Sequence, residues 1–124
     1  MLLLVPSEDF EIAQRLEICY HETIHSEHFG KGLEGFNLEE FKLQTEEGKK
    51  LFLIASESDA HRKHIQELGK IKTNGFYLRE YQKFLINEFT GYMRLLPQLV
   101  ELGYDEKLSR KIFEKYNNLS YHKL

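Results

Sequence analysis

Apolar residues recur at intervals of three and four along much of this chain, and this spacing constrains the fold more than any other feature. The clearest case runs from about Phe76 to Leu96, where one side of a helix would collect Tyr81, Leu85, Phe89, Tyr92 and Leu96. Such a period places side chains on one face of an α-helix and is typical of amphipathic helices around a shared core. The sequence therefore predicts an all-α fold.

Local start and stop signals divide the chain into about four helices. Ser7 can cap a first helix that runs to about His28, where glycines follow. An Asn74-Gly75 turn precedes the helix from about 76 to 96, and Pro97 is expected to kink or end it. Asp105 can cap a last helix that runs to the C-terminus. Short connections favour antiparallel neighbours, so we expect a four-helix antiparallel bundle in one domain, residues 1–124.

Residues 41–55 allow two interpretations. They can belong to one helix that crosses Gly48, preceded by a cap at Asn37, or they can form a short hairpin with a turn at 46–49. The apolar run from Leu51 to Ala55 fits a buried helix or a buried strand. The helix is favoured because Leu and Ala are good helix formers and the pattern continues towards Ile71. The alternative is an α+β fold with a hairpin at about 41–55.

Composition limits the class of protein. A chain of 124 residues with 41% hydrophobic residues can bury one core without a disulfide. Its one cysteine, Cys19, allows no internal disulfide and is typical of a reducing compartment, so a cytoplasmic location is expected. A net charge of -3 makes nucleic-acid binding unlikely. No apolar run approaches the length of a transmembrane helix, so no membrane partner is expected.

Histidines and carboxylates on the first predicted helix have the spacing of metal ligands. Glu17, His21 and His28 follow one another along an edge of the apolar stripe, and His25 lies further round the helix. Residues one turn apart on a helix can bind the same ion. The first helix can therefore supply part of a metal site.

Two further polar residues fall on faces that are otherwise apolar. His61 lies in the middle of its predicted face, with His64 on the flank and Glu57 nearer the outside, and Glu88 falls on the face of the next helix. A carboxylate is costly to bury unless it is paired, hydrogen-bonded or bound to a metal. The sequence therefore predicts an iron or zinc site with His61 and Glu88 as inner ligands, completed by Glu17, His21 or His28.

Two other interpretations stay open at this point. An inward histidine can also be a core residue bonded to a carboxylate or a tyrosine, for example His61 to Glu88. Alternatively, the protein is a non-enzymatic interaction module that acts as a dimer or with a partner protein. The third helix favours this because its aromatic residues give more apolar surface than one core face needs. They are Phe76, Tyr77, Tyr81, Phe84, Phe89 and Tyr92. Whether the protein is an enzyme is left undecided.

Two short motifs carry a resemblance to a known family. Glu22-Thr23-Ile24-His25 has the Glu-x-x-His spacing, and the stretch from Ala55 to His61 is similar to a second-helix motif, with Ser58 in place of its carboxylate. In these motifs and in its helix layout, the chain resembles ferritin-like and rubrerythrin-like proteins. That resemblance implies a four-helix bundle that binds iron between carboxylates and histidines.

Overall fold

The computed structural model of the chain describes residues 7–71 and 76–118, and all of its regular structure is helical. In chain order the elements are α1 (Ser7–Leu16), the π-helix η1 (Glu17–Glu22), α2 (Thr23–Lys31), α3 (Leu38–Phe41), α4 (Glu46–Gly69), α5 (Phe76–Glu101) and α6 (Glu106–Tyr116). These ranges contain no strand. The all-α expectation is therefore confirmed and the hairpin at 41–55 is wrong. The turn expected at Asn74-Gly75 lies outside the described residues.

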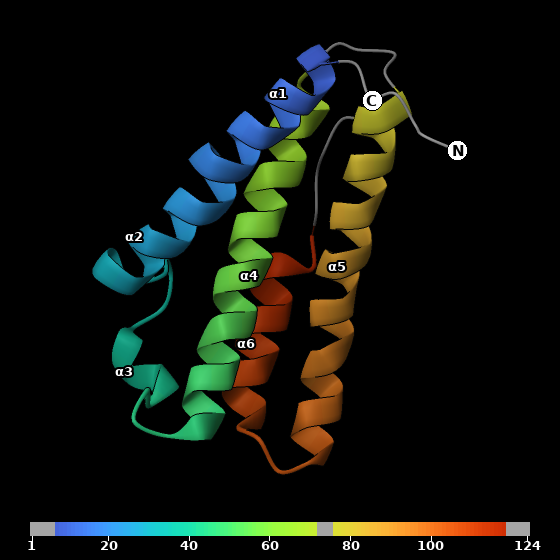
Figure 1. Cartoon of the computed structure of the whole chain (residues 1–124). Helices are drawn as coiled ribbons and strands as arrows, with labels where there is room; N and C mark the ends of the chain where they lie inside the picture. The colour runs from blue at the N-terminus through green and yellow to red at the C-terminus, as the bar shows by residue number, and fades with distance from the viewer. Residues whose placement is uncertain (1–6, 72–75, 119–124) are drawn as a thin grey trace.

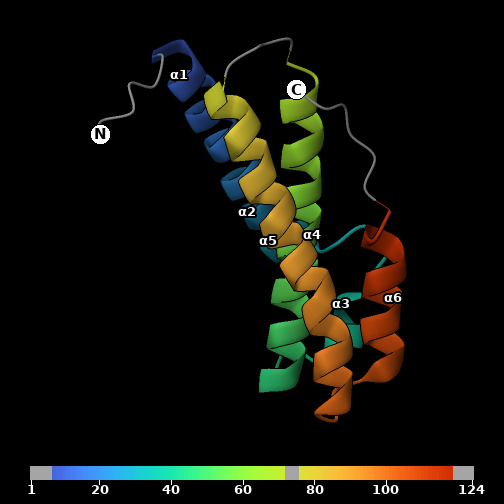
Figure 2. The same ribbon diagram turned by 90° about the vertical axis from the view of Figure 1, so that its right-hand side faces the viewer.

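The helices α4 and α5 form a central antiparallel pair (Figure 1). The continuous segment α1–η1–α2 crosses this pair obliquely on one side, and α6 packs against it on the other side (Figure 2). The short α3 packs beside α4. None of the helices in the described ranges is long and apolar enough to cross a membrane. The arrangement leaves η1 and α2 directly against the middle of α4, where the histidines are.

The corner between α3 and α4 explains why residues 41–55 are not one helix. The helical conformation ends at Lys42, which has a positive φ of 52°. Thr45 then caps the next helix, because its hydroxyl oxygen accepts a hydrogen bond from the Gly48 amide at 3.0 Å. A Cβ on Gly48 would lie 1.8 Å from the carbonyl oxygen of Phe41. Helix α4 therefore crosses Gly48 as expected, but it begins only at Glu46.

Helix α5 continues past Pro97, where the sequence predicts a kink or an end. It runs to Glu101, and Gly103 follows with a φ of 99°. Pro97 itself is exposed, whereas Leu96 and Leu99 are buried. Burial of each leucine contributes about 2 kcal/mol, which offsets the hydrogen bond that a proline cannot make.

The first predicted helix is continuous, but its middle turn is a π-helix. Hydrogen bonds from i to i+5 over Glu17–Glu22 add about one residue to the turn. Every residue beyond this turn is therefore rotated back by about 100° relative to an uninterrupted α-helix. The Thr23 hydroxyl donates to the Ile18 carbonyl at 2.8 Å within this turn. The extent of the helix is close to the prediction, but its second half shows a different face to α4.

Candidate metal centre

Five histidines meet where η1 and α2 pack on α4; the sixth, His122, lies outside the described residues. His21, His25 and His28 come from the first segment, and His61 and His64 come from α4. The ring of His21 is central, because its centroid lies 4.9 Å from that of His25, 4.6 Å from His61 and 6.0 Å from His64. The fold therefore gathers imidazoles from two distant parts of the sequence.

His64 is the most deeply buried of these histidines and has the fewest polar partners. Its side chain is 0% exposed, and neither ring nitrogen has a hydrogen-bond partner among the described residues. The nearest carboxylate oxygen, Glu17 Oε2, is 3.8 Å from Nδ1, which is too long for a hydrogen bond. Burial lowers the pKa of His64 to about 4, although the charge of Glu17 opposes this. His64 is therefore neutral at pH 7, and its expected place on a flank is wrong.

Glu17, His21 and His64 together could hold a metal ion. One ligand atom from each lies within 4.8 Å of the other two. The Tyr81 hydroxyl of α5 donates to Glu17 Oε2 at 2.7 Å, and the Tyr81 ring stands edge-on to His64 at 5.5 Å. Two imidazoles with one carboxylate is the donor set of open zinc sites and of non-haem iron sites.

A second group of three shares His21 with the first. It consists of His21, Glu57 and His61, whose ligand atoms also lie within 4.8 Å of one another. Glu57 Oε2 is 3.3 Å from both His21 Nε2 and His61 Nδ1, and Oε1 is 2.9 Å from His25 Nε2. Burial raises the pKa of Glu57, but the three imidazoles outweigh it and hold the pKa far below its usual value. Glu57, whose side chain is only 18% exposed, is thus more central than the sequence predicts.

His61 uses both of its ring nitrogens. Nδ1 donates to the Glu57 carbonyl oxygen at 2.8 Å, and Nε2 lies 2.8 Å from Glu88 Oε2. Burial lowers the pKa of His61, but the hydrogen bonds to Glu57 and Glu88 outweigh it and raise the pKa. The side chain of Glu88 is 44% exposed, so it reaches His61 from the rim and is not a core carboxylate as its position on the apolar face suggests.

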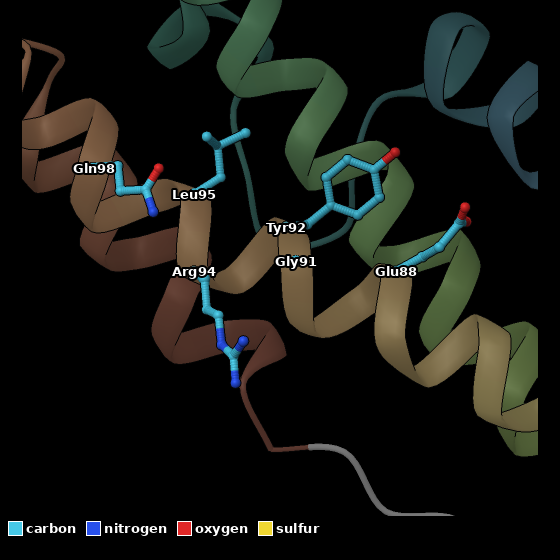
Figure 3. Close-up of a pocket in the computed structure, with 6 residues that line it drawn as sticks. All are labelled: Glu88, Gly91, Tyr92, Arg94, Leu95 and Gln98. Carbon is cyan, nitrogen blue, oxygen red and sulfur yellow. The ribbon is translucent and has the colours of Figure 1, made fainter.

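An open pocket on α5 adjoins this pair. It has a volume of about 290 Å³ and is lined by Glu88, Gly91, Tyr92, Arg94, Leu95 and Gln98. Figure 3 shows Glu88 and Tyr92 on the side of α5 that faces α4, whereas Arg94 points away. The Tyr92 ring is edge-on to His61 at 5.6 Å. Solvent in the pocket therefore reaches the Glu88 edge of the histidine cluster.

His28 belongs to a different polar network. Its Nδ1 lies 2.7 Å from Ser56 Oγ and its Nε2 donates to Asp59 Oδ2 at 2.7 Å. His25 Nδ1 contacts the same Ser56 oxygen at 2.7 Å, and Lys63 Nζ lies 3.1 Å from Asp59 Oδ2. Burial raises the pKa of Asp59, but the hydrogen bonds from His28 and Lys63 lower it by more. His28 is outside both groups of potential ligands.

The structure thus sorts the residues expected to bind metal into three places. Glu17 and His21 lie together, His61 is paired with Glu88, and His28 is bonded to Ser56 and Asp59.

The predicted ligand set leaves out His25, Glu57 and His64, which are central to the cluster. His25 turns inward because the π turn rotates α2. Glu57, His61 and His64 occupy positions i, i+4 and i+7 of one helix, a spacing that places them on one face and could have identified them from sequence.

The aromatic residues of α5 leave less exposed surface than the sequence suggests. Phe89 is buried, and Tyr81 and Tyr92 are half-buried against histidines. Phe84 is 54% exposed. The apolar surface available to a partner on this helix is therefore smaller than a count of aromatic residues implies.

Comparison with known protein families, curated protein sequences and solved structures finds no match to this chain. The resemblance to ferritin-like and rubrerythrin-like proteins therefore stays an expectation from sequence. The function has to be argued from the side chains of the cluster.

Proposed function

We propose that this protein binds a divalent transition-metal ion, zinc or iron, through Glu17, His21 and His64. The observation that carries the proposal is the fully buried imidazole of His64. It lies next to Glu17 and His21, but neither of its nitrogens has a hydrogen-bond partner among the described residues. An unsatisfied buried polar group costs about 1–3 kcal/mol. A metal ion would remove that cost at one of the two nitrogens, because a neutral imidazole offers one lone pair to the ion.

This group of three fits an ion better than the group around Glu57. Glu57 contacts three imidazoles and His61 uses both nitrogens, so an ion there would have to replace existing contacts. In the group with His64, Nδ1 of His21 is also buried without a hydrogen-bond partner. We therefore assign Glu57, His61 and Glu88 to the surroundings of the ion.

The donor set points to the kind of ion and the kind of site. Imidazole nitrogens suit zinc and iron, whereas calcium and magnesium prefer oxygen ligands. Three protein ligands leave positions for water or a substrate, as in catalytic zinc sites and unlike closed structural sites. The scaffold supports this, because with α1–η1–α2 counted as one helix we interpret it as a four-helix bundle, a fold that holds metals between facing helices.

Metal titration of the purified, chelator-treated protein tests the proposal. We expect one Zn²⁺ or, without oxygen, one Fe²⁺ per chain, and a gain of about 2.7 kcal/mol in stability at 100 times the Kd. His64→Leu should abolish binding and the rise in Tm. The matched control is His28→Gln, which changes a buried histidine of the same cluster and should keep the ion. Equal binding by wild type and His64→Leu would show that the proposal is wrong.

A further inference from the structure

Tyr81 contacts two of the three proposed ligands from a helix that supplies none of them. Its hydroxyl donates to Glu17 Oε2 at 2.7 Å, and its ring lies edge-on to His64 with an interplanar angle of 64°. We infer that Tyr81 is a positioning residue that holds Glu17 as a one-oxygen ligand and so keeps a coordination position of the metal open. The inference rests on the metal site proposed above.

Glu17 needs such a partner because its side chain is not fixed by burial. It is 42% exposed, so a free carboxylate there would turn towards water. Ordering a long glutamate side chain costs about 1–2 kcal/mol in rotamer entropy. A hydrogen bond to an ionised carboxylate is worth about 1.5–3 kcal/mol and can offset that cost. The Tyr81 hydroxyl therefore keeps Glu17 turned towards the cluster.

The same hydrogen bond sets how Glu17 can bind. It fixes the rotation of the carboxylate with Oε2 nearest to His64, at 3.8 Å from Nδ1. A carboxylate held at one oxygen is not free to turn both oxygens to one ion. Burial, together with the hydrogen bond to Glu17, raises the pKa of Tyr81, so its hydroxyl keeps the proton that it donates. Glu17 thus occupies one position on the ion where a chelating carboxylate would occupy two.

Tyr92 provides a matched comparison on the same helix. Its ring stands edge-on to His61 at 5.6 Å and 64°, almost as the Tyr81 ring stands to His64 at 5.5 Å and 64°. Among the described residues, the Tyr92 hydroxyl makes no hydrogen bond to a carboxylate like the one that joins Tyr81 to Glu17. Tyr92→Phe therefore removes a tyrosine hydroxyl beside a histidine, as Tyr81→Phe does, but it breaks no hydrogen bond to a proposed metal ligand.

Cobalt substitution distinguishes the two tyrosines. Co²⁺ is bound to wild type, Tyr81→Phe and Tyr92→Phe, and its visible absorption is recorded, because this absorption weakens as the coordination number rises. We expect Tyr81→Phe to weaken the Co²⁺ bands and to lower Zn²⁺ affinity about 10- to 100-fold, the usual effect of losing a residue that orients a ligand. Tyr92→Phe should leave both unchanged.

Two outcomes would overturn the inference. If Tyr81→Phe keeps the wild-type spectrum and affinity while His64→Leu abolishes binding, the metal site stands and the role of Tyr81 is wrong. If both tyrosine variants change the spectrum equally, the effect belongs to packing and not to Glu17. Wild-type binding by His64→Leu would instead overturn the metal site itself, so the two failures are distinguishable.

Discussion

His28 and His64 are both buried in one cluster, yet their polar surroundings are opposite. His28 is 4% exposed and has a partner 2.7 Å from each ring nitrogen, whereas His64 is 0% exposed and has a hydrogen-bond partner at neither. Burial alone therefore does not separate a structural histidine from a candidate ligand. What separates them is whether the ring nitrogens have hydrogen-bond partners.

The difference arises from what α4 offers to each part of the first segment. Opposite α2 it presents Ser56 and Asp59, a hydroxyl and a carboxylate that complement an imidazole. Opposite η1 it presents His61, His64 and one carboxylate, Glu57, which lies 3.3 Å from His21 Nε2 but leaves both nitrogens of His64 without a hydrogen-bond partner in the described part of the chain. Protein groups therefore satisfy both ring nitrogens of His28, whereas both ring nitrogens of His64 have no hydrogen-bond partner among the described residues.

The largest expected effect that tests this comparison is on the stability of the metal-free protein. His28→Leu removes the hydrogen bonds of His28 to Ser56 and to Asp59. We therefore expect the free energy of unfolding to fall by about 4 kcal/mol. His64→Leu removes two unsatisfied nitrogens and should change stability by about 1 kcal/mol or less, in either direction. Urea unfolding with a chelator present measures both. Equal losses would mean that His64 has partners that the structure does not show.

The pH dependence of stability gives the next largest effect. Because the pKa of His64 falls from 6.5 to about 4 on folding, the unfolded chain binds its proton more readily between these values. Stability should therefore fall as pH drops from 6.5 to about 4, by about 3 kcal/mol from this group. Urea titrations of the metal-free protein across this range should show a smaller fall for His64→Leu.

His61 serves as the control, because its pKa is raised on folding and its contribution has the opposite sign. That contribution is fully present below pH 6.5 and is lost as pH rises through the folded pKa. A His61→Gln variant should therefore still lose stability as pH falls from 6.5. If His61→Gln lost the fall in stability below pH 6.5 while His64→Leu kept it, the fall would have to be assigned to His61 and not to His64.

The smallest effect concerns the π turn that separates the two regions. Thr23→Val removes the hydroxyl that bonds the Ile18 carbonyl, and we expect a loss of less than about 1 kcal/mol because the bond is exposed. Thr23→Ser keeps the hydroxyl and should behave as wild type in urea unfolding. Identical stability of the valine and serine variants would show that this bond does not support the turn.

Local signals in the sequence predict the helices well. Asp105 caps α6 by accepting from the Leu108 amide, and Asn37 accepts from the Glu39 amide at the start of α3, both as the residue types suggest. The break at Lys42 and the passage of α5 through Pro97 were not predictable in this way. They depend on a close contact between backbones and on burial of leucines, which only the folded chain supplies.

The cluster could be predicted only in part. The 2.8 Å contact between His61 and Glu88 is one of the pairings that the sequence allows. The inward orientation of the His25 side chain could not be predicted, because counting 100° per residue assumes a helix without a π turn. The burial of His64 depends on side chains of η1 and α5 that pack against it, such as His21 and Tyr81, and helical spacing on α4 alone does not predict them.

The π turn makes the length of the chain, and not only its residue types, a determinant of the cluster. Because the π turn takes up one extra residue, deleting one residue between 17 and 22 would give an ordinary α-helix with His25 and His28 still facing Ser56. Closing the turn into an α-helix with every residue kept would instead turn both histidines away from Ser56 by about 100°. A one-codon insertion that the turn does not absorb would therefore uncouple the two halves of the cluster without replacing any histidine or carboxylate, whereas a one-codon deletion in the turn would keep them coupled.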